Sequence, residues 1–187
     1  MAPRRRGTPG LPSSRLAGLI EAELSGPRRE VGDDGRARFV PVGDGPVLEL
    51  ASRVEKRFLG RTEIAVFRAG FDTLLPEEAV VALRHTGGLK RTGVTAILVE
   101  GGEAGAGVAS SLATDPGLAQ VLMPLDFTRF EVFCGPAGCR AEVELMGASL
   151  VAMALPPLRS YGHLDPDQRD AMISGFEAVR RVLVDIR

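Results

Sequence analysis

Several residue types are scarce in this sequence, and each scarcity argues against a class of function. The 187 residues include no tryptophan and a single tyrosine, Tyr161, so few aromatic side chains are available to stack on nucleotide bases. Lysine and arginine number 23, aspartate and glutamate number 24, and the formal net charge is −1. The overall charge therefore gives no reason to expect nucleic acid or an anionic membrane as a partner.

Metal-ligating residues and long apolar runs are also lacking. Two cysteines, Cys134 and Cys139, cannot complete a zinc site, which needs about four ligands, so we expect no metal and no cofactor. The longest apolar run, residues 145–158, contains two prolines and is shorter than the roughly 20 residues of a membrane span. No signal-peptide pattern is visible, and we expect a cytoplasmic protein without a membrane span.

The composition of the first residues differs from that of the rest. Residues 1–12 consist largely of arginine, glycine and proline and offer little to bury, which predicts a disordered basic arm. Residues 13–187 are long enough to bury a core and are predicted to form a single domain. This domain begins with residues 13–25, which have apolar residues at helical spacing and a glycine–proline stop.

The last third of the chain is the most informative about the fold. Apolar and polar residues alternate in residues 127–134 and 139–146, on either side of a Gly-Pro-Ala-Gly turn, which predicts a β-hairpin. A third strand is expected at residues 150–155, after a bulge or bend at Gly147. This order of elements predicts an antiparallel sheet.

Two helices are expected to cover this sheet. Asp165-Pro166-Asp167-Gln168 is typical of a helix start, with an acceptor at the cap, proline in the first turn and glutamine at the capping-box position. The helix is predicted to run to about residue 184, with a wide apolar stripe that includes Met172, Phe176 and Leu183. A shorter helix is expected near residues 108–123, interrupted near Asp115-Pro116.

Two segments fit both a helix and a strand. In residues 46–59 the apolar residues match helical spacing, yet most of them also fall on alternate positions. We favour a strand there, with Gly60-Arg61 as a hairpin turn into a clear strand at residues 62–68. Residues 77–86 begin like a helix but contain β-branched residues, and both possibilities stay open.

These elements predict an α+β fold. We expect a curved antiparallel sheet of six or more strands, with the long C-terminal helix and the shorter helix near residues 108–123 packed on it. If residues 46–59 and 77–86 were both helices, the alternative would be a doubly wound α/β layer. The predicted hairpin already argues against an all-parallel sheet.

A glycine-rich segment, residues 101–107, follows a confident strand at residues 94–99. Residues 105–110 resemble the G-x-G-x-x-G pattern of a phosphate-binding turn, with serine in the last position. The pattern begins well after the strand, and the helix behind it meets Pro116 within about two turns. A flexible loop without a nucleotide is therefore the prediction.

Candidate acid/base residues lie on the predicted hairpin. Glu142 and Glu144 share one strand face, roughly 7 Å apart, and suit either an acid/base pair or a solvated surface. Arg129 and Arg140 are placed to pair with glutamates across the hairpin.

The remaining candidate reactive side chains are two histidines and two thiols. His85 and His163 lack a partner at metal-binding spacing, and no G-x-S-x-G elbow accompanies them. Cys134 and Cys139 flank the hairpin turn, so they suit either a disulfide, if the geometry permits one, or two small buried apolar groups.

Three short strings carry a resemblance to a known family. They are His-Thr-Gly-Gly at residues 85–88, Met-Pro-Leu-Asp-Phe-Thr-Arg at residues 123–129 and Gly-Ala-Ser at residues 147–149. Together they resemble an uncharacterised bacterial family of domains of unknown function. The resemblance covers most of residues 80–187 and implies no activity.

Three functions stay open. The first is a non-catalytic binding domain that encloses a small hydrophobic ligand between the sheet and the C-terminal helix. Its candidate ligand-binding residues are His85, Arg129, Glu142, Glu144 and Phe176. The second function is a protein–protein adaptor or oligomer subunit that uses the arginine-rich residues 84–91. The third is an enzyme of unknown reaction built on His85, His163, Glu142 or Glu144, and no catalytic residue is assigned.

Overall fold

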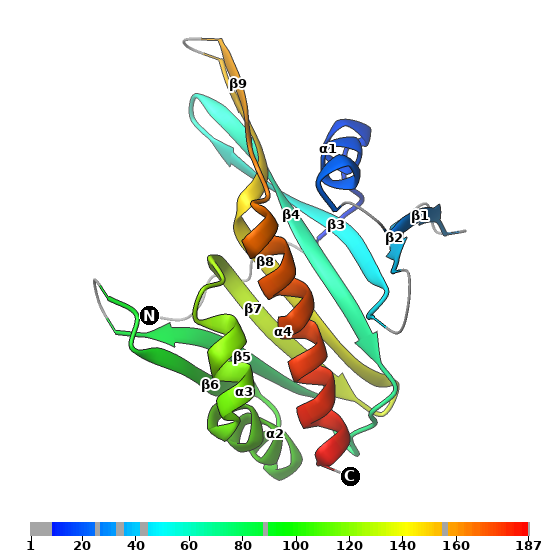
Figure 1. The fold of residues 1–187 in the computed structure, drawn as a ribbon, viewed down its shortest axis with the longest axis vertical. Helices are drawn as coiled ribbons and strands as arrows, with labels where there is room; N and C mark the ends of the chain where they lie inside the picture. Colours follow the sequence, from blue (N-terminus) through cyan, green and yellow to red (C-terminus); the bar gives the residue numbers. More distant parts are fainter. Residues whose placement is uncertain are drawn as a thin grey trace.

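The structure, a computed structural model, describes residues 9–24, 27–32, 36–41, 45–87, 90–154 and 157–186 (Figure 1). Within these ranges the helices are α1 (Ser14–Leu24), α2 (Glu103–Thr114), α3 (Pro116–Leu122) and α4 (Pro166–Asp185). The strands are β1 (Arg28–Val31), β2 (Ala37–Val40), β3 (Leu48–Arg57), β4 (Gly60–Phe71), β5 (Ala79–Thr86), β6 (Gly93–Glu100), β7 (Phe127–Gly135), β8 (Gly138–Met153) and β9 (Leu158–Gly162). Residues 1–8 of the predicted disordered arm lie outside the described residues.

The nine strands form one antiparallel sheet in the order β1-β2-β3-β4-β8-β7-β5-β6. The last strand, β9, pairs with the far end of β8, beyond the part of β8 that pairs with β7. The predicted α+β fold with an antiparallel sheet of six or more strands is confirmed. The alternative of a doubly wound α/β layer was wrong, because both ambiguous segments are strands.

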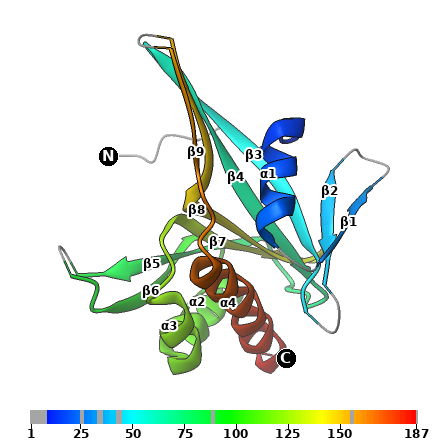
Figure 2. The same ribbon diagram turned by 45° about the horizontal axis from the view of Figure 1, so that its top comes forward.

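Helix α4 covers the sheet as its apolar stripe predicts (Figures 1 and 2). The side chains of Met172, Phe176, Val179 and Leu183 have no exposed surface. The Phe176 ring lies 5.8 Å from the ring of Phe130 on β7. The apolar residues of α1, α2 and α3 join the same core, so the four helices lie against one face of the sheet.

The start of α4 differs from the prediction in one detail. Asp165 caps the helix by accepting from the Asp167 amide at 2.8 Å. Gln168 does not close a capping box, because its amide donates to the Pro124 carbonyl at 2.7 Å and its oxygen accepts from the Asp126 amide at 2.6 Å. Gln168 therefore ties α4 to the loop before β7.

The turn between β3 and β4 lies two residues earlier than the predicted Gly60-Arg61 turn. Phe58 and Leu59 form the turn, and Gly60 is the first residue of β4. A Cβ atom on Gly60 would lie 2.5 Å from the Ala152 carbonyl oxygen on β8. Glycine is needed here because the two strands approach closely, and not because of the turn.

The predicted glycine-rich loop at residues 101–107 was wrong beyond its first two residues, because α2 begins at Glu103. The Glu77 carboxylate accepts from the Ala104 amide at 3.1 Å and so occupies the place where a phosphate would bind a helix start. A Cβ atom on Gly105 would lie 2.7 Å from the Ala79 side chain. Gly105 therefore allows close packing of α2 on β5. The predicted interruption at Asp115-Pro116 is confirmed.

Strand β8 continues through Gly147, where a bulge or bend was predicted, and so joins the two strands expected on either side of it. Ile64 and Val66 of β4 pair with Ser149 and Glu144 of β8, respectively. Between these two pairs β8 advances by five residues while β4 advances by two. This bulge contains Ala148, which is buried and has a φ of 53°. The bulge adds an odd number of residues, so odd-numbered side chains face the helices before it and even-numbered ones after it.

Beyond the bulge the sheet extends into a projection that we call the finger, made of residues 54–62, 151–154 and 157–160 (Figures 1 and 2). It contains the ends of β3, β4 and β8 together with β9, a strand that the sequence did not predict. No described helix is long and apolar enough to cross a membrane.

Candidate functional site

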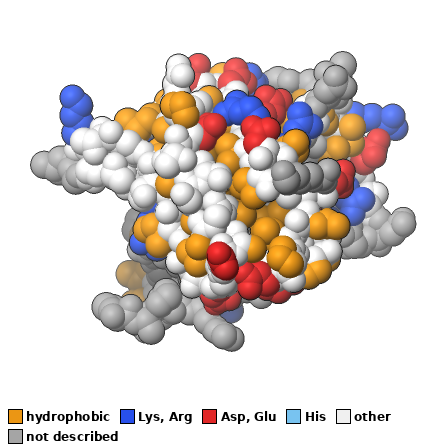
Figure 3. All heavy atoms as spheres, turned by 90° about the horizontal axis from the view of Figure 1, so that it is seen from below, with side chains coloured by type: hydrophobic (Ala, Val, Ile, Leu, Met, Phe, Trp, Pro, Cys, Tyr) orange, Lys and Arg blue, Asp and Glu red, His pale blue; other side chains and the backbone are white. Residues whose placement is uncertain are grey.

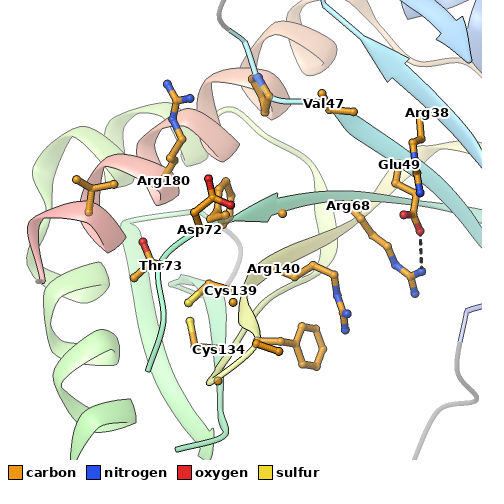
Figure 4. Close-up of a pocket in the computed structure, with 18 of the residues that line it drawn as sticks. Arg38, Val47, Glu49, Arg68, Asp72, Thr73, Cys134, Cys139, Arg140 and Arg180 are labelled. Atoms are coloured by element: carbon orange, nitrogen blue, oxygen red, sulfur yellow. Dashed lines mark hydrogen bonds and ion pairs between the residues drawn. The ribbon is translucent and has the colours of Figure 1, made fainter. Parts of the chain in front are cut away.

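A cleft of about 1110 Å³ opens at the end of the sheet opposite the finger (Figure 4). It lies between the end of β4, the β7–β8 turn, residues 45–47 and the last turns of α4. Hydrophobic side chains reach the surface at this end of the molecule, with acidic and basic side chains around them (Figure 3).

Glycine keeps part of this cleft bare. Gly70 is opposite Arg140 on β8, and no heavy atom lies within 4 Å of the position that a Cβ would take. Phe71, Val47 and Val184 supply apolar surface nearby. The cleft therefore extends around the end of β4, with open space at Gly70 on the face away from the helices and apolar surface at Phe71 on the helix-covered face.

Arginines and carboxylates also line the cleft. The Arg140 side chain is 51% exposed, lies 3.0 Å from the Glu142 carboxylate and stacks 5.0 Å from the centre of the Phe133 ring. Glu49 accepts from Arg36 at 2.9 Å and from Arg68 at 3.3 Å. Arg180 on α4 is exposed and makes no ion pair with a described residue. Arg140 and Arg180 are therefore accessible to an anion.

Two thiols face each other at the edge of this cleft (Figure 4). Cys134 and Cys139 are paired across the hairpin next to Gly135 and Gly138, and both are buried and reduced. The thiol of Cys134 hydrogen-bonds to that of Cys139, which raises the pKa of Cys134, and burial raises it further. The same hydrogen bond lowers the pKa of Cys139. Cys139 is therefore the more readily ionised thiol.

The predicted candidates Glu142 and Glu144 lie on the sheet face away from the helices, and neither is solvated. Their exposures are only 5% and 1%. Arg53 binds Glu144 with both nitrogens of a fork, at 3.0 and 2.5 Å, and Arg68 lies 2.9 Å from Glu142. Both carboxylates are therefore engaged by arginines in the sheet, and neither is a free side chain open to a substrate.

Arg129 belongs to the same charged network. It donates to Glu131 at 2.5 Å and lies 3.6 Å from Glu144, so the predicted pairing across the hairpin is observed. The hydrogen bond to Glu131 raises the pKa of Arg129 more than its partial burial lowers it. Arg129 therefore neutralises buried carboxylates, and a ligand would have to displace them to reach it.

The other candidates lie elsewhere. His85 is on the helix-covered side, where its Nε2 is 2.9 Å from the Leu122 carbonyl and its ring stacks 4.3 Å from Phe127. His163 is exposed, 2.8 Å from Glu23. Phe176 is completely buried in the core. The structure brings Arg129, Glu142 and Glu144 together and separates them from both histidines and from Phe176.

The arginine-rich residues 84–91 divide into exposed and engaged side chains. Arg84 and Lys90 are exposed. Arg91 binds the Asp126 carboxylate and donates to the Met123 carbonyl at 3.2 Å, so it fixes the loop before β7. No group of three or more potential metal ligands occurs among the described residues.

Sequence reasoning missed Gly70 and Arg180. Both reach the cleft only because residues 45–47, the end of β4 and the last turns of α4 meet in space, and no local pattern marks them. The alternation that predicted the hairpin did place Cys134, Cys139 and Arg140 correctly relative to one another.

Comparison with known families gives one match. Residues 22–183 match the family described as "Protein of unknown function (DUF3156)". The chain belongs to the DUF3156 family. This match confirms the family of unknown function that the sequence resembles. No curated protein and no solved structure matched the chain. The DUF3156 match includes Gly70, Cys134, Cys139, Arg140 and Arg180 of the cleft, and also the finger.

Proposed function

We propose that this DUF3156 chain is a non-catalytic binding domain, and that the cleft holds a small molecule with an acidic group on an apolar body. The observation that carries the proposal is the combination of open space at Gly70 with two accessible arginines, Arg140 and Arg180. Binding sites for small molecules combine apolar surface with a few well-placed polar groups, and this cleft has the same combination.

The close packing of α4 on the sheet favours the cleft as the binding site over the space between the sheet and α4. A hydrophobic ligand enclosed between the sheet and α4 stays a prediction from the sequence. The side chains of Met172, Phe176, Val179 and Leu183 have no exposed surface, so a ligand there would have to displace them. The cleft needs no such rearrangement. A cytoplasmic location accompanies this proposal as an expectation.

The test uses a fluorescent probe of the proposed chemical class, 8-anilinonaphthalene-1-sulfonate, which has an apolar body and one anionic group. We expect saturable binding to the folded protein, with one probe molecule per chain. Gly70→Leu fills the bare floor and should weaken binding at least tenfold, and Arg180→Ala should weaken it several-fold because a charge-assisted contact is lost.

Matched variants control for general effects. Gly18 on α1 also has no heavy atom within 4 Å of a Cβ position, and Arg84 is also an exposed arginine that makes no ion pair with a described residue. Gly18→Leu and Arg84→Ala should leave probe binding unchanged. Equal effects of the cleft and control variants, or absence of saturable binding, would contradict the proposal. Native mass spectrometry of gently purified protein then reports any co-purified ligand.

A further inference from the structure

The finger exposes apolar side chains that the rest of the molecule does not cover. Phe58 is 99% exposed at the turn, and its neighbour Leu59 is 43% exposed. Three further apolar side chains on the finger are at least one-third exposed, namely Val54, Met153 and Leu158. A group of exposed apolar side chains at the end of a projection is typical of an interaction surface.

Cations lie in a row across the same finger. Lys56 pairs with Arg61, Arg61 with Ala152, and Ala152 with Arg159, so three basic side chains share one face of adjacent strands. None of the three has a hydrogen bond or ion pair with a described residue. Directly opposed like charges destabilise a sheet, so the row is costly unless an external anion is close.

We propose that the finger docks on an anionic lipid bilayer. Phe58 and Leu59 enter the boundary between headgroups and acyl chains, and Lys56, Arg61 and Arg159 contact the anionic headgroups. Exposed aromatic and aliphatic side chains beside basic ones are the composition of interfacial membrane anchors. The net charge of −1 for the whole chain conceals this local concentration of cations.

A lipid surface fits the finger better than a protein partner does. A stable protein interface buries about 800 Å² on each side with shape complementarity. Strands β3 and β4 of the finger are joined by a two-residue turn, and Phe58 protrudes from this turn with 99% of its surface exposed. A bilayer accepts a protruding phenylalanine without a matching pocket. The proposal is independent of the function proposed for the cleft.

Vesicle sedimentation tests the proposal directly. We expect the full chain to bind vesicles of equal parts phosphatidylglycerol and phosphatidylcholine, and to bind pure phosphatidylcholine vesicles much more weakly. Raising the salt concentration from 0.05 to 0.5 M should reduce binding, because salt screens exposed charges. Phe58→Ser should weaken binding about tenfold. The triple variant K56Q/R61Q/R159Q should weaken it on the order of 100-fold, at roughly fivefold for each cation.

Matched variants elsewhere provide the controls. Val31 on β1 is 62% exposed, and Val31→Ser removes a comparable apolar side chain from the body of the protein. The triple variant R15Q/R84Q/K90Q removes three exposed cations that lie outside the finger. Both controls should bind the mixed vesicles within about twofold of the wild type if the finger carries the binding.

A tryptophan probe locates the contact, since the chain has no tryptophan of its own. In the Phe58→Trp variant, vesicles should shift the emission to shorter wavelength, and brominated lipids should quench it. Val31→Trp should show neither change. Together these signals distinguish insertion of the finger from adsorption of the body.

Three results would overturn the proposal. The first is absence of binding to the mixed vesicles at low salt. The second is equal weakening by the finger variants and their controls. The third is a dimer or larger species in light scattering that Phe58→Ser converts to monomer without any vesicle binding, which would assign the finger to a protein contact.

Discussion

Charged side chains are paired and buried in the body of the sheet, whereas the cations of the finger are exposed and have no partner among the described residues. In the body, Arg53 forms an ion pair with Glu144 and Arg68 forms one with Glu142, and Glu144 is only 1% exposed. On the finger, Lys56, Arg61 and Arg159 lie together without a carboxylate partner in the described part of the chain. Charges in the body therefore stabilise the sheet internally, whereas charges on the finger are available to something outside.

The phenylalanines of the body and the finger differ in the same way, and their substitution should give the largest difference in the free energy of unfolding. Phe176→Ala should lower the free energy of unfolding by about 4 kcal/mol, because the side chain is completely buried and its loss leaves a cavity. Phe58→Ala should change it by less than about 0.5 kcal/mol, because that side chain is almost fully exposed. Urea unfolding followed by circular dichroism measures both. Similar losses in the two variants would break the comparison.

Removal of one buried charge should have the next largest effect. Glu144→Ala leaves Arg53 and Arg129 facing each other without their shared carboxylate, and we expect a loss of about 3 kcal/mol in urea unfolding. The double variant R53M/E144L removes the buried pair and fills its space, so it should recover part of this loss. A Glu144→Ala variant as stable as wild type would show that the pair is not stabilising.

A tyrosine at the base of the finger should give a smaller, pH-dependent effect. Tyr161 on β9 donates to Glu23 of α1 at 2.5 Å, and burial together with this carboxylate raises the pKa of Tyr161 above its usual value near 10. The hydroxyl therefore stabilises the fold fully below pH 10. Above that pH the unfolded chain ionises first, and stability should fall by up to about 1.4 kcal/mol per pH unit.

The single tyrosine makes this prediction easy to measure. Absorbance of tyrosinate at 295 nm reports Tyr161 alone, because the chain has no other tyrosine and no tryptophan. The midpoint should lie above pH 10 in the folded protein and near 10 in urea. Tyr161→Phe should remove the tyrosine part of the loss of stability above pH 10. Equal midpoints in the folded and unfolded states would contradict the assignment.

Charge reversal on the finger should give the smallest effect, with the opposite sign. Lys56→Glu places a carboxylate opposite Arg61 and should raise the free energy of unfolding by roughly 0.5 kcal/mol. The same variant should bind anionic vesicles more weakly. A gain in stability with a loss of binding is expected only if the cations serve an external partner. Destabilisation by Lys56→Glu would show that Lys56 has an internal role.

Local patterns were sufficient to predict the hairpin of β7 and β8. Alternation placed Arg129 opposite its partner Glu144, since cross-strand neighbours follow from register alone. The pairing predicted for Arg140 across the hairpin was wrong, because Arg140 is opposite Phe133 and binds Glu142 two residues along its own strand. In residues 46–59 the apolar positions 50, 54 and 58 fit a period of two and a spacing of four equally well. The register with β4, which decides the strand, is visible only in the folded chain.

Long-range features could not be predicted in this way. Glu142 and Glu144 read as a solvated strand face, because their partners Arg53 and Arg68 are supplied by β3 and β4, far away in the sequence. Gly60 resembled a turn residue, although its role is set by the Ala152 carbonyl of another strand. The cleft needs four distant segments, so no single stretch of sequence shows it.

The bulge at residues 145–148 also makes the finger sensitive to changes in chain length. Deletion of one residue there would exchange the two faces of β8 in everything that follows, turning Met153 toward the side where Ala152 now lies. Deletion of two residues would leave the faces as they are. Insertions and deletions in this bulge among natural variants should therefore comprise an even number of residues if the orientation of the finger is retained.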